Sequence, residues 1–171
     1  RNPGSLATWA IFASSFEAVS TSLRPYSDSD FENLHALDRA CYPPGIAYSK
    51  SMLRWYLRVR GGFCIVAELE GEIQGFILAE AEPPEGHIIT LDVAEPFRRT
   101  GIGTALTEAA EKKMAGRGVS MVGLETATDN EAAVAFWKRR GYRIVGVIPR
   151  YYLDRVDAWF MRKAIAGPKE T

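Results

Sequence analysis

The chain has 171 residues, of which 47% are hydrophobic, and its 21 Lys and Arg residues balance its 21 Asp and Glu residues. This length and composition are typical of one globular domain with a buried core. The even charge balance leaves no global field that would attract a nucleic acid or an anionic membrane, so we expect neither as a partner.

The chain contains two cysteines, Cys41 and Cys64, which are far apart and lack the spacing of a metal site. Small secreted domains rely on disulfides, whereas reduced thiols are typical of the cytoplasm. We therefore expect a cytoplasmic protein without a disulfide framework and without a bound metal.

The first twenty residues begin without Met and carry one short apolar run, "LATWAIFA", after a single basic residue. This run is short for a secretion signal, and nothing else in the sequence indicates export. Chain ends are commonly poorly ordered. We interpret residues 1–20 as a mobile N-terminal extension, residues 21–166 as a single domain and residues 167–171 as a frayed end.

The first readable element is "TSLRPYS", which predicts a short edge strand closed by Pro25. Residues 27–44 then carry apolar side chains at helical spacing, and two prolines end this first helix. A second helix is expected over residues 50–60, with Ser49 as its N-cap and a glycine pair at its end.

Two β-rich runs follow, at residues 63–70 and 72–82, and they meet at a tight Glu70-Gly71 corner. This arrangement predicts an antiparallel hairpin, after which residues 86–93 form a third strand. From there strands and helices alternate, which implies crossover connections and at least partly parallel pairing. The expected elements are a helix over 101–118, a strand over 119–126, a helix over 129–141, and strands over 142–148 and 157–165.

The segment "PFRRTGIGTAL", residues 96–106, places two arginines and two glycines directly before a helix. The first backbone N–H groups of a helix lack acceptors and lie at its positive end, so they can bind an anion. Gly101 and Gly103 lack the Cβ atoms that would obstruct such a ligand, and Arg98 and Arg99 add positive charge. A diphosphate is therefore the expected ligand.

Two nucleotide-binding motifs are excluded at this loop. The Walker motif ends in Gly-Lys-Ser or Gly-Lys-Thr, whereas Gly103 is followed by Thr104 and Ala105. The dinucleotide fingerprint has three spaced glycines, and this loop has two. Neither ATP at a Walker loop nor NAD is therefore expected.

Two motifs together indicate a family. Residues 98–103 have the pattern Arg-x-x-Gly-x-Gly after a strand that ends at Val93, and "LETATDNEAAVAFWKRRGY" lies downstream. In order and spacing these segments resemble the GNAT superfamily of N-acetyltransferases, and the resemblance covers residues 23–165. The downstream segment matches the family pattern at Asn130, Ala133, Trp137, Gly141 and Tyr142.

The resemblance implies both a fold and a co-substrate. It implies an α/β protein with a mixed sheet of about six to seven strands flanked by about four helices, the GNAT fold. Glu125, five residues before Asn130, and the segment "PRYY" resemble the ribosomal-protein alanine N-acetyltransferase (RimI-like) branch in particular. The implied co-substrate is acetyl-CoA, without a metal.

The resemblance also implies where acetyl-CoA binds. The pantetheine arm pairs with a strand backbone, the pyrophosphate binds the glycine-rich loop, and an asparagine contacts the cofactor near its sulfur. The matching strand residues are Leu91, Asp92 and Val93, the loop residues are Arg98, Arg99, Thr100, Gly101, Ile102, Gly103 and Thr104, and the asparagine is Asn130.

Acetyl transfer to an amine needs a neutral nucleophile, a stabilised oxyanion and a departing thiol. The resemblance implies that Glu125 is the general base and acts through a water. An α-amine, with a pKa of about 7.7–8.0, is partly neutral at cellular pH, whereas a lysine amine, with a pKa of about 10.4, is almost wholly protonated. A carboxylate relay therefore suits an N-terminal α-amine better than a lysine.

Trp137 stands where the resemblance implies a tyrosine that protonates the leaving thiolate. An indole N–H donates a hydrogen bond but does not release a proton in this range. Three explanations stay open: another tyrosine supplies the proton, the thiolate leaves with only hydrogen-bond help because a thiol pKa lies near about 8.5, or the chain binds CoA without fast turnover. The alternative acids are Tyr142, Tyr151 and Tyr152.

The acceptor should enter opposite the cofactor, between "CYPPGIAYS" and "PRYYLD", where tyrosines can form its walls. His35 and His87 show no partner pattern and are expected on the surface or at caps. We predict a cytoplasmic N-acetyltransferase, monomeric or homodimeric, that acetylates the N-terminal α-amine of a protein or peptide. The alternatives are acetylation of a small-molecule amine and a non-catalytic CoA-binding regulatory module.

Overall fold

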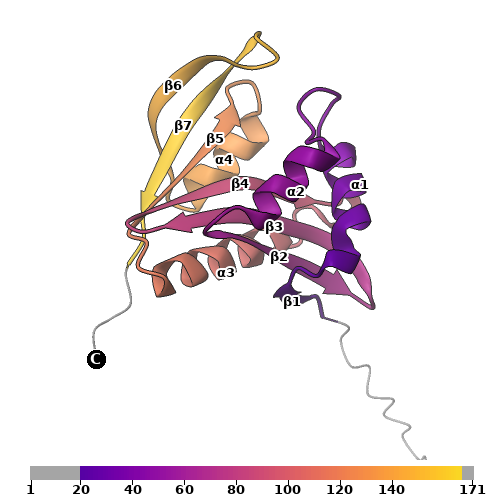
Figure 1. The fold of residues 1–171 in the computed structure, drawn as a ribbon. Coiled ribbons are helices and arrows are strands. Elements are labelled where there is room, and N and C mark those ends of the chain that lie inside the picture. Colours follow the sequence, from indigo (N-terminus) through magenta and orange to yellow (C-terminus); the bar gives the residue numbers. More distant parts are fainter. Residues whose placement is uncertain (1–19, 167–171) are drawn as a thin grey trace, which may run out of the picture.

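The computed structural model describes residues 20–166, so the expectations for residues 1–19 and 167–171 lie outside the described residues. A mixed β-sheet forms the centre of this part, with helices packed against it (Figure 1). The strands are β1 Ser22–Pro25, β2 Gly62–Leu69, β3 Glu72–Glu82, β4 Glu85–Val93, β5 Met121–Ala127, β6 Arg143–Tyr152 and β7 Val156–Ala164. The helices are α1 Phe31–Cys41, α2 Lys50–Arg58, α3 Ile102–Gly116 and α4 Glu131–Arg139, with 3-10 turns η1 Asp28–Asp30 and η2 Glu95–Phe97.

Within residues 20–166 the sheet has seven strands in the order β1-β2-β3-β4-β5-β7-β6. β1 to β4 form an antiparallel series, in which each strand pairs with the next along the chain. β4 and β5 pair in parallel, and β7 lies between β5 and β6, antiparallel to both. The expected mixed α/β sheet and the partly parallel pairing in its later half are therefore confirmed.

β4 and β5 pair only at their first residues, where the parallel ladder joins residues 85–87 to residues 121–123. Beyond His87, β4 continues beside β3 and β5 continues beside β7. A register shift between β3 and β4 leaves one β4 residue, Ile89, without a partner, and such a bulge bends a strand. The two strands therefore separate, and a stretch of β4 has no neighbouring strand on that side.

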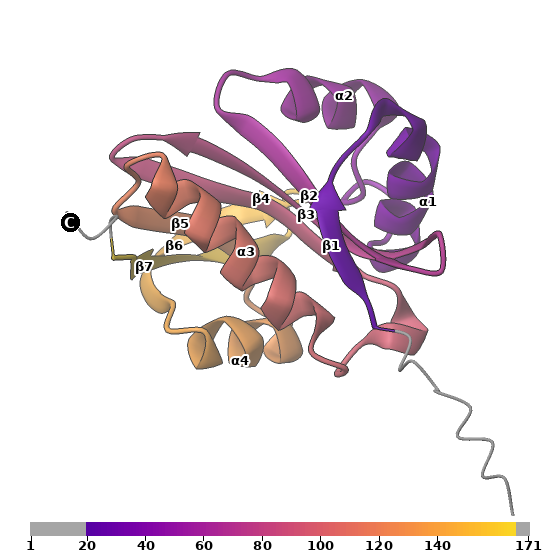
Figure 2. The same cartoon turned by 90° about the horizontal axis from the view of Figure 1, so that it is seen from below.

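Helices cover both faces of the sheet: α1 and α2 lie on one face, and α3 and α4 on the other (Figure 2). The core under α1 and α2 includes Leu34 and Phe76. The core under α3 includes Leu106 and Leu124. Because side chains alternate along a strand, each central strand contributes to both cores.

Most expected elements occur near the predicted residues, and Ser49 caps α2 by accepting a hydrogen bond from Met52 N. Two expected boundaries are wrong. α2 ends at Arg58 rather than at residue 60, because Val59 already adopts extended backbone angles. β6 does not stop at residue 148 but continues to Tyr152, which still pairs with β7.

Candidate active site

Glu125 and His87 meet where β4 and β5 begin to separate. His87 Nε2 lies 2.8 Å from Glu125 Oε2, and these side chains are 35% and 15% exposed. His87 is the last β4 residue paired with β5, opposite Gly123, and Glu125 lies two residues further on the same face. Gly123 has no Cβ, and the imidazole Nδ1 lies 3.8 Å from the position that a Cβ would take. The structure therefore places His87 against Glu125 rather than at a cap.

This Glu125–His87 pair faces the side of the sheet that carries α1 and α2. Its strand neighbours Ile88 and Leu124 belong to the core under α3, and successive side chains of a strand point to opposite faces. The pair therefore lies on the same side of the sheet as the α1–α2 loop, one of the two segments that were expected to bind the acceptor.

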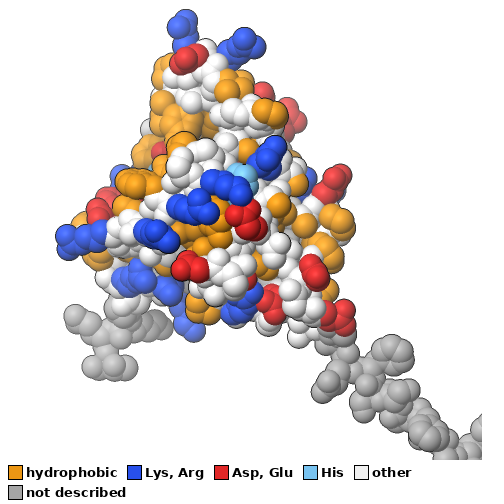
Figure 3. All heavy atoms as spheres, turned by 45° about the vertical axis from the view of Figure 1, so that its right-hand side comes forward, with side chains coloured by type: hydrophobic (Ala, Val, Ile, Leu, Met, Phe, Trp, Pro, Cys, Tyr) orange, Lys and Arg blue, Asp and Glu red, His pale blue; other side chains and the backbone are white. Residues whose placement is uncertain are grey.

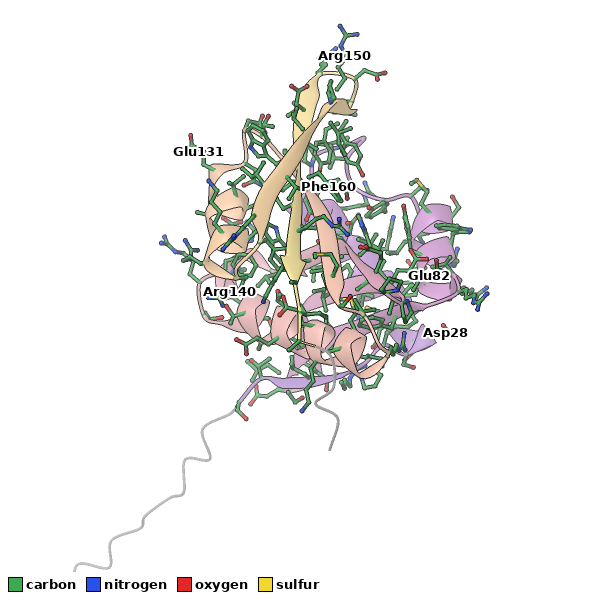
Figure 4. All side chains as sticks on the ribbon, turned by 90° about the vertical axis from the view of Figure 1, so that its left-hand side faces the viewer. Asp28, Glu82, Glu131, Arg140, Arg150 and Phe160 are labelled. Atoms are coloured by element: carbon green, nitrogen blue, oxygen red, sulfur yellow. The ribbon has the colours of Figure 1, made fainter. Side chains whose placement is uncertain are left out.

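Those two acceptor segments touch each other. A Cβ on Gly45, in the α1–α2 loop, would lie 2.6 Å from Leu153 Cδ2, in the β6–β7 turn. Gly45 has a φ of 90°, which favours glycine, so both the backbone and the close approach require this residue. Arg150 lies near the tip of the β6–β7 hairpin, which extends beyond the other strands of the sheet (Figure 4).

Tyr151 and Tyr152 of the second segment lie beside Glu125, and Tyr48 of the first segment packs against Tyr56 of α2. The rings of Tyr48 and Tyr56 are 5.4 Å apart between centroids, and those of Tyr151 and Tyr152 are 4.9 Å apart. Burial raises the pKa of Tyr151, and the negative charge of Glu125 adds to this effect, as it does for Tyr152. Apolar side chains are also exposed below the hairpin tip (Figure 3), so the acceptor side is aromatic and partly open.

Leu91 and Val93 direct their backbone groups into the opening between β4 and β5. Ala94 N–H donates to Gln74 O on β3 at 2.8 Å. Residues of an antiparallel strand alternately face the partner strand and face away from it. The backbone of Asp92 therefore faces β3, whereas the backbones of Leu91 and Val93 face away and can pair with an extended ligand.

Side chains already bind the carbonyl groups of these two residues. Tyr42 Oη donates to Leu91 O at 3.4 Å. Arg98 Nε donates to Val93 O at 2.9 Å, and Arg98 Nη2 lies 3.6 Å from Cys41 Sγ. Arg98 thus fixes the start of the loop to the end of β4, instead of extending to the rim as a free charge.

α3 begins without a side-chain N-cap, because its N-cap residue is Gly101. Gly101 has a φ of 94°, which favours glycine. The first helical hydrogen bond runs from Ala105 N–H to Gly101 O, so the N–H groups of Ile102, Gly103 and Thr104 have no acceptor within the helix. At the positive end of a helix, three such groups can bind an anion.

Arg140 adds a cation beside this helix start, which was not expected from the sequence. Its Nη1 donates to Thr104 Oγ1, and its guanidinium lies 5.7 Å from the centroid of the Phe136 ring. Arg140 follows the last turn of α4 on the side of α3, whereas Glu131 lies at the other end of α4 (Figure 4). Only the packing of α4 against α3 brings this charge to the loop.

The other expected cofactor residues have local structural roles. Asn130 is the N-cap of α4, and its Oδ1 accepts from Ala133 N at 3.1 Å. Thr100 Oγ1 donates to Phe97 O and closes the turn before α3. Arg99 is exposed and has a φ of 63°, so its side chain extends from a tight turn.

Trp137 and Tyr142 belong to the core on the α3 side. Trp137 is 7% exposed, and its ring lies 4.9 Å from that of Phe136 and 5.2 Å from that of Tyr142. The Tyr142 hydroxyl donates to Glu111 Oε1 on α3 at 2.9 Å. Burial and then the charge of Glu111 raise the pKa of Tyr142. Tyr142 is therefore engaged on the face opposite to Glu125.

Residues 20–166 contain no group of three or more His, Cys, Asp or Glu side chains that could hold a metal ion. Over the same range, no helix is long and apolar enough to cross a membrane.

The chain is similar to proteins of one family. A family model described as the acetyltransferase (GNAT) family matches residues 31–142. An N-alpha-acetyltransferase of Sulfolobus acidocaldarius is 30% identical over 146 residues, which cover 78% of this chain and 86% of that protein.

Solved structures share the fold. Ard1 from Thermoplasma volcanium has a TM-score of 0.79 and 27% identity, and the match covers 86% of this chain and 99% of that chain. The ribosomal-protein-S18-alanine N-acetyltransferase from Escherichia coli has a TM-score of 0.78 and 19% identity, with 89% and 99% covered. NAA60 from Arabidopsis thaliana, in complex with acetyl-CoA, has a TM-score of 0.74 and 22% identity, with 85% and 99% covered.

Proposed function

Because the chain belongs to the acetyltransferase (GNAT) family, we propose that this N-acetyltransferase moves the acetyl group of acetyl-CoA to the N-terminal α-amine of a protein or peptide. The Glu125–His87 pair, at the opening between β4 and β5, is the observation that carries this proposal. The relative from Sulfolobus acidocaldarius is itself named an N-alpha-acetyltransferase. That name supports an α-amine as the acceptor.

Acetyl-CoA would lie in the opening between β4 and β5, with its pyrophosphate at the start of α3. The backbone of Leu91 and Val93 faces this opening, and three N–H groups at the start of α3, which have no acceptor within the helix, would bind the pyrophosphate. Arg140, held on Thr104, adds positive charge there. When bound, acetyl-CoA supplies the activated thioester. A ligand with a peptide-like arm and a diphosphate fits both features.

Glu125 would take the proton of the attacking amine, directly or through a water. Its Oε2 lies 2.8 Å from His87 Nε2, so the imidazole fixes the direction of the carboxylate. The carboxylate side chain is 15% exposed, which leaves room for a proton path to solvent. An α-amine needs only a modest base, because its pKa of about 7.7–8.0 leaves part of it neutral.

We propose that the thiolate leaves without a proton from α4. Trp137 is packed in the core and has no transferable proton in this range. Tyr142 is the tyrosine nearest to Trp137 in the sequence, and its hydroxyl donates a hydrogen bond to Glu111. A thiol pKa of about 8.5 makes a thiolate a tolerable leaving group near neutral pH. Tyr151 and Tyr152, close to Glu125, are the side chains left to assist.

Gly103→Val tests the pyrophosphate site. A Cβ at Gly103 would lie 3.5 Å from two atoms of the Phe136 ring, so the branched methyl groups of valine would have to turn toward the free N–H groups. Loss of one charge-assisted hydrogen bond costs about 1.5–3 kcal/mol, so the Kd for CoA should rise about tenfold to a hundredfold. Isothermal titration calorimetry measures this Kd. Gly103→Ala is the matched control and should bind CoA like the wild type. A wild-type Kd for Gly103→Val would contradict a pyrophosphate site at the start of α3.

His87→Ala tests the orienting role of the histidine. Without the imidazole, the Glu125 carboxylate loses a partner at 2.8 Å and can rotate. A misplacement of about 1 Å can lower a rate about a hundredfold, so kcat should fall by up to about that factor with the Kd for CoA unchanged. His87→Gln keeps a donor and should recover part of the rate. Equal kcat for the wild type and His87→Ala would exclude this role.

A thiol-release assay with acetyl-CoA tests the proposed acceptor class. The panel contains peptides with free N-termini that differ in their first residue, together with polyamines, amino acids and aminoglycosides. Faster release with peptides than with any small amine is expected. The reverse order would favour a small-molecule acceptor, and tight CoA binding without release for any amine would favour a CoA-binding regulatory module.

A further inference from the structure

Two carboxyl groups are buried together between α1 and β4. Asp38 is 0% exposed and Asp92 is 1% exposed. Burial raises the pKa of Asp92, and the negative charge of the neighbouring Asp38 carboxylate raises it further. Two neighbouring carboxylates, away from water, would repel each other and lose their hydration. Buried carboxyl pairs of this kind keep one proton between them.

Among the described residues, one oxygen of each carboxyl group lacks a hydrogen-bond donor, and a shared proton would supply one. Asp38 Oδ2 accepts from Tyr48 N–H at 2.6 Å, and Asp92 Oδ1 accepts from Thr90 Oγ1 at 2.7 Å. The other two oxygens, Asp38 Oδ1 and Asp92 Oδ2, are buried and receive no hydrogen bond from a donor within residues 20–166. Carboxylate oxygens only accept, so a hydrogen bond between the two groups needs a proton on one of them.

Burial is the largest effect on the pair and favours its protonated form, whereas His35 lowers the pKa of Asp38. The ionisable groups that face it are His35, Cys41, Tyr42 and Tyr48 from α1 and the α1–α2 loop, and Cys64 from β2. Arg98 reaches this region only through Cys41, at 3.6 Å from its Sγ. Burial raises the pKa of Asp92 to about 8 and also raises the pKa of Asp38.

The same pair lies where the α1–α2 loop is attached to β4. The backbone of Tyr48 is held by Asp38, and its hydroxyl donates to Ile89 O at 3.5 Å. The Tyr42 hydroxyl donates to Leu91 O at 3.4 Å. The loop that carries the acceptor tyrosines is therefore attached to the strand that faces acetyl-CoA.

We propose that Asp38 and Asp92 share one proton and are positioning residues, which hold the α1–α2 loop against β4 so that the acceptor reaches Glu125. The positioning role rests on the proposed function, whereas the shared proton is a property of the folded protein alone. When the proton leaves, two negative charges repel each other across the joint between loop and strand, and the loop loosens.

The sign of the pH dependence follows from the proton count. The folded protein keeps a proton that aspartates of the unfolded chain release near pH about 4. Stability therefore falls as the pH rises from about 4 toward the folded pKa of Asp92, about 8, and this contribution is constant above it. Asp92→Asn removes the dependence, because its amide donates to Asp38 without a titrating proton.

Urea unfolding of the wild type and Asp92→Asn at several pH values tests the shared proton. The ratio of the two unfolding equilibrium constants, wild type over variant, should rise about tenfold per pH unit between about pH 5 and about pH 8, and then level off. Glu108→Gln is the control, because it replaces an exposed carboxylate on α3 by an amide. Its ratio of unfolding equilibrium constants should not change with pH. A constant ratio for Asp92→Asn would overturn the shared proton.

Steady-state kinetics with a peptide acceptor tests the positioning role. Asp38→Ala releases Tyr48 N–H, so the KM for the peptide should rise about tenfold while the Kd for CoA stays within about twofold, and Asp38→Asn should recover most of the effect. An unchanged peptide KM in a folded Asp38→Ala variant would overturn this role. If no peptide is acetylated by the wild type, the proposed function fails, while the unfolding experiment still decides on the proton.

Discussion

Replacing Glu125 by Gln is expected to lower kcat by about 10²- to 10⁴-fold, the range for loss of a general base. This corresponds to about 3–5 kcal/mol of transition-state stabilisation. Glutamine keeps the size of the side chain and can still contact His87 Nε2, which lies 2.8 Å from the carboxylate in the wild type. It cannot take a proton from the amine. The measurement is single-turnover acetylation of a peptide at saturating acetyl-CoA.

The Kd for CoA is the internal control of this experiment. Glu125 lies on the face toward α1 and α2, whereas the phosphate site lies at the start of α3, so CoA should bind normally to the variant. Glu108→Gln, on the exposed side of α3, should leave kcat unchanged. If Glu125→Gln turns over like the wild type from acidic to alkaline pH, another group removes the proton.

Trp137→Ala is expected to destabilise the protein by about 3–5 kcal/mol, as for a large aromatic side chain removed from a core. Trp137 is 7% exposed and contacts the rings of Phe136 and Tyr142. For a domain of this size, Tm should fall by about 6–20 °C. Differential scanning calorimetry measures it. Trp55→Ala, at a residue that is 60% exposed, should change stability by less than about 0.5 kcal/mol.

Trp137→Phe separates packing from chemistry. Phenylalanine keeps a ring in the core but has no N–H, so kcat should stay within about threefold of the wild type if Trp137 has no part in thiolate release. A loss of more than about tenfold, in a variant that is folded, would mean that the indole N–H stabilises the leaving sulfur.

The fold could be predicted from local patterns because its elements have clear starts and stops. Ser49 is an N-cap before a polar and apolar helical repeat, and the Glu70-Gly71 corner separates two β-rich runs. The loop from Arg98 to Thr104 was found for the same reason, since its arginines and glycines lie in one short run of the sequence. Glu125 was chosen as the general base through the resemblance to the family, and that role stays a prediction.

Contacts between distant segments could not be predicted in this way. His87 looks like an isolated polar residue in a strand, and only the short β4–β5 ladder brings it to Glu125. Arg140 follows α4 and reaches Thr104 through helix packing. Asp92 alternates with apolar neighbours like a solvent-facing residue, yet α1 covers it completely. Each case depends on which strand or helix is the neighbour, which no local pattern specifies.

If this acetyltransferase modifies N-terminal α-amines, the position of the acetyl group on a peptide shows it. Peptides that carry one free N-terminus and one internal lysine are incubated with acetyl-CoA and sequenced by tandem mass spectrometry, beside the same peptides with a blocked N-terminus. We predict an acetyl group on the α-amine, an unmodified lysine, and no acetylation of the blocked peptides. Acetyl-lysine in free and blocked peptides alike would contradict the account.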